Sequence, residues 1–301
     1  MTELMNTKEV AAYLGIHEKK VYALVKVGKI PCTRVTGKWV FPRKLIDHWI
    51  EESAKGPVKK RRDEMSSLLL AAGSDDPCLG ILRELCTRRL GPTSFFLATV
   101  GSSAGLAALR DGVADLALAH VRHPDTGEYN LPYLGSTIPS SAAVVPLFHR
   151  ELGLVTQPGN PFGLRSVADL TRAGLRFVNR QDGSGTRIFV DQELARLGID
   201  PERITGYQVA VPTHLEVGLK ILRGEADAGL ATHAAARLLG LEFIPLTQER
   251  FDLVIMKERF FTRPVQAVLE IAGSREFRTR VEALGGYDTS ESGRILSATP
   301  S

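Results

Sequence analysis

The sequence predicts an α/β protein preceded by a small basic helical domain, and three observations support this. The first fifty residues contain short helical patterns and a marked excess of positive charge. From residue 65 onward strand patterns alternate with helix patterns, and several strands end in Gly/Ser-rich turns. With 301 residues and 44% hydrophobic content, the chain is long enough for a sizeable core in two or three domains.

The N-terminal region begins with two short amphipathic helices. Asn6 or Thr7 can cap the first helix, and Gly15 can end it in a left-handed turn. Its apolar face consists of Val10, Ala11 and Leu14, and that of the second helix of Val21, Leu24 and Val25. Outward positions of the second helix are His17, Lys19, Lys20 and Tyr22. Two short helices joined by a tight turn form a helix-turn-helix unit, whose second helix enters the major groove.

A hairpin and a third helix follow this unit. Residues 30–35 and 38–41 are expected to form two strands that are joined by a turn at 36–37. Side chains expected to contact DNA from this wing and the helix after it are Arg34, Lys38, Trp39 and Arg43. Pro42 opens the last helix, residues 43–52. The apolar side chains expected to close the small core are Leu45, Ile46, Trp49 and Ile50.

Positive charge is concentrated in this region. Residues 1–63 hold ten Lys and four Arg against seven acidic residues, a net charge of +7, whereas the whole chain carries +4, which leaves −3 for the remainder. Positive charge that is confined to one small domain can neutralise the phosphates of a DNA backbone. Double-stranded DNA is therefore the expected partner of residues 1–52. Residues 53–64 are expected to be a basic linker, whose run at 59–62 either touches the DNA backbone or is a solvated spacer.

The order of these elements resembles the excisionase/MerR-type winged helix-turn-helix family. The resemblance covers residues 4–52 and rests on two segments, TKEVAAYLG at 7–15 and VYALVKVGKIP at 21–31. It implies duplex DNA binding, with the second helix as the reader and the hairpin as a clamp on the backbone. The alternative is a small helical interaction module with a solvated basic face.

The sequence gives no sign of a membrane segment or of export. It has no run of about eighteen apolar residues and no charged-then-apolar leader pattern. Its three cysteines, Cys32, Cys78 and Cys86, are an odd number without metal-type spacing. We therefore expect a cytoplasmic protein without a metal or a cofactor.

Strands and helices alternate in the region from 65 to 290. The expected strands are 66–72, 95–100, 115–120 and 175–179, and the expected helices are 78–89, one opening at Ser102, and 188–197. A helix that starts just after a strand exposes unpaired N–H groups and a positive dipole end. Such starts occur after 72, after 100 and after 179, and at the last of them the motif GSGTR at 183–187 lets the backbone approach a ligand. Several such turns together predict a cradle for an oxyanion.

The sequence lacks the motifs of nucleotide binding and of common catalytic sites. A dinucleotide-binding turn would need a third glycine where Ile188 stands, and no P-loop occurs. No nucleophile elbow, zinc pair or Cys-x-x-Cys is present, so we expect no enzyme. An enzyme that acts on an anionic small molecule is the alternative of another class.

This region looks like the PBP-like ligand-binding domain of the type II periplasmic-binding-protein group. The segments that carry the resemblance are 101–106, 114–117, His120, 125–130, 159–161, 177–180, 183–187, 213–214 and 226–229. The resemblance implies two α/β lobes joined by crossover segments near 144–154 and 243–253. Lobe one would be 65–146 and 252–290, lobe two 150–245, and 291–301 a C-terminal tail. The ligand would lie in the cleft between the lobes.

Candidate ligand-binding residues lie at the turns. They are Ser74, Asp75, Ser102, Ser103, His120, Arg180, Gly183, Ser184, Gly185, Thr186, Arg187, Thr213 and His214. His120 is equally well interpreted as a hydrogen-bonded core histidine, and Arg180 and Arg187 can instead pair with Asp182 or Asp191. Asp75 is a doubtful contact, because a carboxylate beside an anion costs free energy.

The ligand is expected to be a small anion. Clustered hydroxyls and helix N-termini favour an oxyanion, and kinship with the molybdate and tungstate binders makes those two ions the first expectation. Sulfate, phosphate or a small carboxylate fits the same donors, and Arg187 or His214 would favour a carboxylate. The whole chain is expected to be a ligand-responsive transcriptional regulator. It should form a homodimer or homotetramer, because one winged domain buries little surface on DNA.

Overall fold

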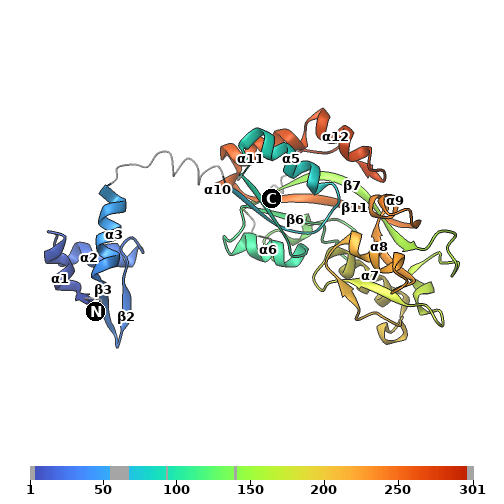
Figure 1. Cartoon of the computed structure of the whole chain (residues 1–301), viewed down its shortest axis with the longest axis horizontal. Coiled ribbons are helices and arrows are strands. Elements are labelled where there is room, and N and C mark those ends of the chain that lie inside the picture. Colours follow the sequence, from blue (N-terminus) through green and yellow to red (C-terminus); the bar gives the residue numbers. More distant parts are fainter. Residues whose placement is uncertain (1–3, 55–67, 93, 139–140, 297–301) are drawn as a thin grey trace. The chain divides into compact units, whose positions relative to one another are not determined.

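The computed structural model describes residues 4–54, 68–92, 94–138 and 141–296. The chain divides into two compact units, residues 1–66 and 67–301 (Figure 1). Within the predicted linker and tail, residues 55–64 and 297–301 lie outside the described residues. No helix in the described ranges is long and apolar enough to cross a membrane.

The N-terminal unit contains three helices and a three-stranded sheet in its described part. In chain order these are β1 (Leu4–Asn6), α1 (Thr7–Tyr13), α2 (Glu18–Lys26), β2 (Thr33–Val35), β3 (Lys38–Pro42) and α3 (Arg43–Ala54). The expected cap of α1 is confirmed: Asn6 Oδ1 accepts from the amides of Lys8 and Glu9 at 2.9 and 3.0 Å. The Glu9 carboxylate accepts from the Asn6 amide in return, which completes a capping box.

The small core of this unit differs from the expectation at α3. Its buried members are Met5, Val10, Ala11, Val21, Ile30, Phe41 and Ile46. Leu45 and Ile50 were expected in this core, but their exposed fractions are 51% and 36%. Successive residues turn by about 100° around a helix, so the face that buries Ile46 directs its neighbour Leu45 outward. Strand β1 was not expected; it pairs with β3 and places β3 in the middle of the sheet.

The C-terminal unit alternates strands and helices as expected. Its elements are β4 (Leu69–Gly73), α5 (Leu79–Leu90), β5 (Phe95–Thr99), α6 (Ser102–Arg110), β6 (Leu116–Ala119), the 3₁₀ turn Leu131–Tyr133, β7 (Ala142–Thr156), the 3₁₀ turn Val167–Thr171, β8 (Phe177–Arg180), α7 (Gly185–Leu197), the 3₁₀ turn Pro201–Arg203, β9 (Ala210–Val211), α8 (His214–Leu222), β10 (Ala228–Thr232), α9 (His233–Leu238), β11 (Glu242–Met256), α10 (Lys257–Phe260), α11 (Arg263–Ala272), α12 (Arg275–Glu282) and β12 (Tyr287–Asp288). The predicted α/β class is thereby confirmed.

The strands of this unit form one sheet in the order β5-β4-β6-β11-β7-β10-β8-β9, with β12 paired to β7. Strands β5, β4 and β6 are parallel, and so are β10, β8 and β9. Between these two groups lie the long antiparallel strands β7 and β11. They coincide with the expected crossover segments near 144–154 and 243–253, so the chain passes twice between the two ends of the sheet.

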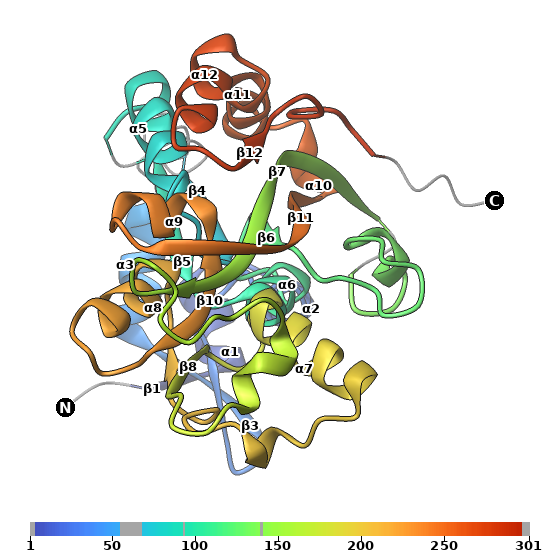
Figure 2. The ribbon, with the colours of Figure 1, turned by 90° about the vertical axis from the view of Figure 1, so that its right-hand side faces the viewer.

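Each end of the sheet is covered by helices on both faces. Leu116 and Leu118 of β6 pack under α5, α11 and α12, whereas Ala117 and Ala119 pack against α6. Figure 1 shows α5, α11 and α12 together on the side of β6 opposite to α6, and Figure 2 shows these three helices at one end of the unit. This part, β4 to β6 with α5, α6, α11 and α12, is called the first half below.

The second half comprises β8 to β10 with α7, α8 and α9. Leu154 of β7 belongs to the apolar cluster of α7, and its neighbour Val155 to the cluster of α8 and α9. Alternate residues of β7 thus pack against helices on the two opposite faces of the sheet. The lobe boundaries at 146, 150, 245 and 252 stay a prediction.

Candidate functional site

Three turns of the first half bring predicted residues together at one edge of the sheet. The Ser74 hydroxyl, just after β4, lies 2.6 Å from the Ser102 hydroxyl at the start of α6. The Ser102 hydroxyl also accepts from the His120 amide, just after β6, at 3.2 Å. All three residues are buried. The carboxyl ends of these parallel strands therefore place Ser74, Ser102 and His120 in one cluster.

The second half contacts this cluster directly. The Ser103 amide donates to the carbonyl of Gly183 at 3.1 Å. The His214 amide, at the start of α8, donates to Asp75 Oδ2 at 3.0 Å. A Cβ atom on Gly185 would lie 2.3 Å from His120 Cε1, so a side chain would not fit there. The N-termini of α6, α7 and α8 are thereby held together across the two halves.

Three buried side chains in this region have polar atoms without a hydrogen-bond partner. They are Arg180 at Nε and Nη1, Thr186 at Oγ1, and His214 at both ring nitrogens. Their exposed fractions are 2%, 1% and 0%. The remaining Arg180 group, Nη2, donates to the carbonyl of Pro212 at 2.6 Å. Because each buried polar group without a partner costs about 1–3 kcal/mol, these atoms indicate a place for a polar guest.

The charges at this place favour an anion. Burial lowers the pKa of Arg180 to about 10, against the opposing effect of the Asp75 charge, so the guanidinium is positive at neutral pH. Burial also lowers the pKa of His214 well below its usual range, and the charge of Arg180 acts in the same direction. The neutral imidazole can donate from one nitrogen and accept at the other. Burial raises the pKa of Asp75, against the effects of the His214 amide and of Arg180.

Other predicted side chains have structural partners. The Arg187 guanidinium, which is among the residues expected to bind ligand, lies 3.1 Å from Asp191 and 4.1 Å from the centre of the Tyr207 ring. Pairing with Asp191 was the alternative interpretation. The hydroxyls of Ser184 and Thr213 cap α7 and α8 by accepting amide hydrogens three residues on. These caps fix the two helix N-termini.

Two family descriptions match the chain. The helix-turn-helix domain matches residues 4–54, and the PBP superfamily domain matches residues 83–273. The chain belongs to the PBP superfamily. An uncharacterized protein of Bacillus subtilis, YvgK, is 27% identical over 310 residues, which cover 99% of each protein.

Solved structures show the same fold. A phosphate transporter substrate-binding protein with bound phosphate from Clostridium perfringens has a TM-score of 0.57 at 15% identity, over 77% of this chain and 99% of that chain. An OxyR mutant from Corynebacterium glutamicum has a TM-score of 0.55 at 16% identity, over 93% of this chain and 90% of that chain. A helix-turn-helix domain joined to a PBP-superfamily domain is the arrangement of a ligand-responsive regulator. The first is a DNA-binding domain type and the second a solute-binding domain type.

A buried ionic network in the PBP-superfamily unit was not expected from the sequence. Arg150 on β7 donates to Asp76 Oδ2 at 2.7 Å and to Glu249 Oε2 on β11 at 3.0 Å. His120 Nδ1 lies 3.1 Å from Glu249 Oε1, and its Nε2 lies 3.1 Å from Arg150 Nη2. Since a guanidinium can only donate, this geometry places the imidazole hydrogen on Nδ1, which donates to Glu249. Burial is the main cause that lowers the pKa of His120.

This network joins the two long strands to the candidate site. Arg150 and Glu249 are direct partners in the register of β7 and β11, and His120 packs against the start of α7 at Gly185. The structure therefore shows His120 as a hydrogen-bonded core histidine that borders the site. The signal in the sequence was the charged residues in the middle of two long apolar segments, Arg150 with Glu151 and Glu249 with Arg250.

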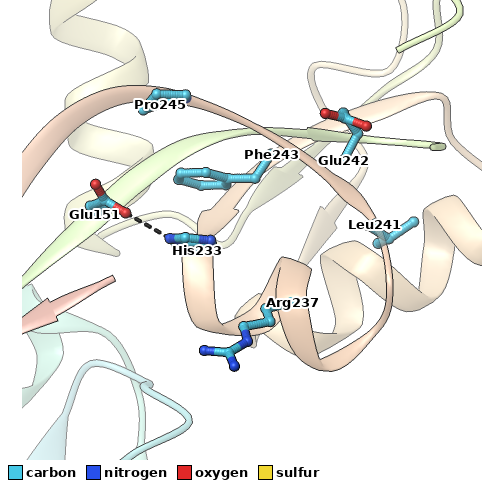
Figure 3. A pocket seen from close by; sticks show the side chains of 7 residues that line it. All are labelled: Glu151, His233, Arg237, Leu241, Glu242, Phe243 and Pro245. Atoms are coloured by element: carbon cyan, nitrogen blue, oxygen red, sulfur yellow. Dashed lines mark hydrogen bonds and ion pairs between the residues drawn. The ribbon is translucent and has the colours of Figure 1, made fainter. Parts of the chain in front are cut away.

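A separate pocket of about 490 Å³ lies against β7, α9 and β11. It is lined by Glu151, His233, Arg237, Leu241, Glu242, Phe243 and Pro245. Figure 3 shows the His233 ring between Glu151, whose carboxylate lies 2.7 Å from Nδ1, and Phe243, on which the ring stacks. No residue expected to bind ligand lines this pocket, so it is distinct from the candidate site.

The N-terminal unit exposes most residues expected to contact DNA. His17, Lys19, Lys20 and Tyr22 are exposed on or next to α2, and Arg34 and Lys38 are exposed on the hairpin. Trp39 is half-buried, with the Arg34 guanidinium 5.6 Å from its ring centre. The Arg43 guanidinium lies 5.0 Å from the centre of the Tyr13 ring.

The described residues contain no group of three or more His, Cys, Asp or Glu side chains that could hold a metal ion.

Proposed function

We propose that this protein is a transcriptional regulator that binds operator DNA through its N-terminal unit and a small anion at the candidate site. The observation that carries the proposal is Arg180. It is a buried cation with two unpartnered donor atoms, and the buried side chains of Thr186 and His214 also have polar atoms without a partner. An anionic guest would supply the missing acceptors.

Among anions, the side chains favour phosphate or a small carboxylate. Molybdate and tungstate were the first expectation from neutral hydroxyls and helix amides, but the guanidinium of Arg180 and the imidazole of His214 add charged and directional recognition. The Clostridium perfringens protein of similar fold holds phosphate, which supports the same choice. Molybdate, tungstate and sulfate remain in the test because the donors can also hold them.

The N-terminal unit supplies the DNA-binding surface in this proposal. Helix α2 would enter the major groove with Lys19, Lys20 and Tyr22, and the β2–β3 hairpin would contact the backbone through Arg34 and Lys38. All five side chains are exposed, and residues 1–63 carry the charge of +7. DNA as a partner is consistent with the expected cytoplasmic location.

A homodimer or homotetramer would present two such units to a two-fold operator. The edge strand β5 is a candidate assembly surface in the C-terminal unit. Phe96 on this strand pairs in register with Leu70 on β4, and their exposed fractions are 51% and 39%. An exposed apolar edge strand favours pairing with another chain. A change in the packing of the two halves when the anion binds would reorient the paired DNA-binding units.

A thermal-shift panel of phosphate, acetate, molybdate, tungstate and sulfate tests the site. A ligand at a hundred times its dissociation constant should stabilise the C-terminal unit by about 2.7 kcal/mol. Arg180→Met should abolish this stabilisation, because it removes the buried cation whose Nε and Nη1 groups have no partner in the protein. Arg176→Met is the matched control, because Arg176 is 49% exposed and pairs with Asp227. Retention of the anion effect in Arg180→Met would refute the site.

Operator titration with and without the stabilising anion tests the regulator. A change in DNA affinity supports the proposal, and an unchanged affinity contradicts it. Consumption of the anion during the titration would instead support the enzyme alternative.

A further inference from the structure

Asp75 occupies a position where an anionic guest would be expected. Its Oδ2 atom accepts from the His214 amide at 3.0 Å, at the N-terminus of the nine-residue helix α8. A carboxylate at a helix N-terminus is stabilised by the helix dipole and by a charge-assisted hydrogen bond. Asp75 comes from the turn after β4 in the first half, so the bond also ties the two halves together.

Asp75 also balances the charge of Arg180 without bonding to it. Arg180 Nε and Nη1 have no hydrogen-bond partner, and the charge of Asp75 is the largest favourable influence on the buried guanidinium. The negative charge of Asp75 and the positive charge of Arg180 thus compensate each other without a hydrogen bond between the two side chains. A guest that brings its own negative charge would bond to Arg180 and would meet Asp75 as a like charge.

We propose that Asp75 is an internal counter-anion of the site, which holds α8 against the first half when the site is empty and opposes the entry of any anion that is fully deprotonated. This inference rests on the proposed function, because it assigns a selective role within the same site. It makes Asp75 a residue that lowers affinity for bare oxyanions rather than a direct contact that raises it.

The surroundings of Asp75 determine how the role depends on pH. The charged and titratable groups near it are Asp76 in its own turn, Arg150 on β7, Arg180 on β8 and His214 on α8. His120 and Glu249 are hydrogen-bonded to each other and to Arg150. Burial raises the pKa of Asp75 above its usual value, with Asp76 adding to the rise and the two arginines opposing it. As the pH falls toward this raised pKa, Asp75 takes up a proton and the repulsion disappears. Anion affinity should therefore rise as the pH falls.

Calorimetric titration of the full-length protein with sulfate and with molybdate, at neutral pH and at mildly acidic pH, tests the counter-anion. Asp75→Asn keeps an oxygen that can accept from the His214 amide and removes the charge. It should bind both ions about tenfold more tightly at the higher pH, and its affinity should depend less on pH than that of the natural protein. Asp182→Asn is the matched control: it removes the same charge beside α7, but its side chain is 92% exposed, so solvent screens it. Equal or weaker binding by Asp75→Asn would overturn the proposal.

A second measurement does not depend on any ligand. Hydrogen exchange in the first turn of α8 should be faster in anion-free Asp75→Ala than in the natural protein, because the amide of His214 loses its acceptor. Unchanged exchange would overturn the proposal even if anions bind. Faster exchange in a protein that binds no anion would instead refute the proposed ligand while keeping the tie between the halves.

Discussion

Replacement of Arg150 by Met should destabilise the C-terminal unit strongly. The guanidinium is 1% exposed and lies 2.7 Å from Asp76 and 2.9 Å from Glu249, whose side chains are 0% and 2% exposed. Met has a similar length and leaves the apolar contacts of the stem in place, but it leaves two buried carboxylates without their cationic partner. Breaking a buried ion pair by removing one partner costs about 3–5 kcal/mol. For a unit of this size we expect the melting temperature to fall by about 6–20 °C.

The loss should depend on pH in a direction that the structure fixes. Burial would raise the pKa of Glu249, but the charge of Arg150 and the hydrogen bonds from His120 and Arg150 lower it to about 2, from an ordinary value of 4.5. In the natural protein this carboxylate therefore stabilises the fold above pH 4.5, and that contribution is lost as the pH falls toward 2. In Arg150→Met the Glu249 carboxylate loses its cation, so burial should raise its pKa and protonation should remove the buried charge as the pH falls. The difference between the two proteins should shrink in acid.

The assay follows from where the tryptophans lie. Trp39 and Trp49 are the two tryptophans of the chain, and both belong to the N-terminal unit. Their fluorescence should report the unfolding of that unit, whereas far-ultraviolet circular dichroism is dominated by the larger C-terminal unit. Arg150→Met should shift the dichroism transition and leave the tryptophan transition unchanged.

Two further variants complete this test. Arg88→Met removes an arginine whose pair with Glu276 is more than half exposed, and it should cost at most about 1 kcal/mol. Adding Asp76→Asn and Glu249→Gln to Arg150→Met should recover part of the lost stability, because the stranded charges are gone. A loss below about 1 kcal/mol for Arg150→Met, or a loss that is equal at neutral and acid pH, would refute the reasoning.

Three other predictions concern both units. Lys20→Gln should weaken operator binding in fluorescence anisotropy and reduce the slope of log affinity against log salt by about 0.9, if Lys20 neutralises one phosphate; an unchanged slope would place it off the DNA. Asn6→Ala removes the acceptor of the capping box and should lower the stability of the N-terminal unit by about 1 kcal/mol in urea unfolding followed by tryptophan fluorescence, and no change would contradict the cap. Gly185→Ala puts a methyl group 2.3 Å from His120 Cε1 and should cost about 1–3 kcal/mol and weaken anion binding in calorimetry; full anion affinity would show that the halves need not approach so closely.

Local patterns were sufficient for the order of elements. The apolar rhythm around Val21 and the cap at Asn6 depend on neighbouring residues, and so they could be predicted from the sequence. The strand-to-helix turns at 101 and 183 likewise appear where glycine and serine suit a tight turn. Leu45 was misplaced because a helical pattern alone does not say how wide a face the core covers.

The partners of the site residues could not be predicted in the same way. Arg180 and Arg187 lie on neighbouring elements and have the same chemistry, yet the first is buried without a full set of partners and the second is paired with Asp191. Arg150 and Glu249 meet because two strands far apart in sequence pair in one register. Hydrogen bonds depend on distances of a few tenths of an ångström, which a one-dimensional pattern does not contain.

By itself the sequence determined the class of this protein: a basic helix-turn-helix domain followed by an α/β domain with helix N-termini at its strand ends. Charge, periodicity and turn chemistry act over a few residues, so they can be read along the chain. The tertiary structure decided which of the polar residues near those N-termini remain without partners, and it placed an acidic side chain at one of them. That outcome depends on how the two halves pack. Burial sets the free-energy cost of an unpaired charge, and contacts between residues far apart in the sequence decide which group lies nearest to it.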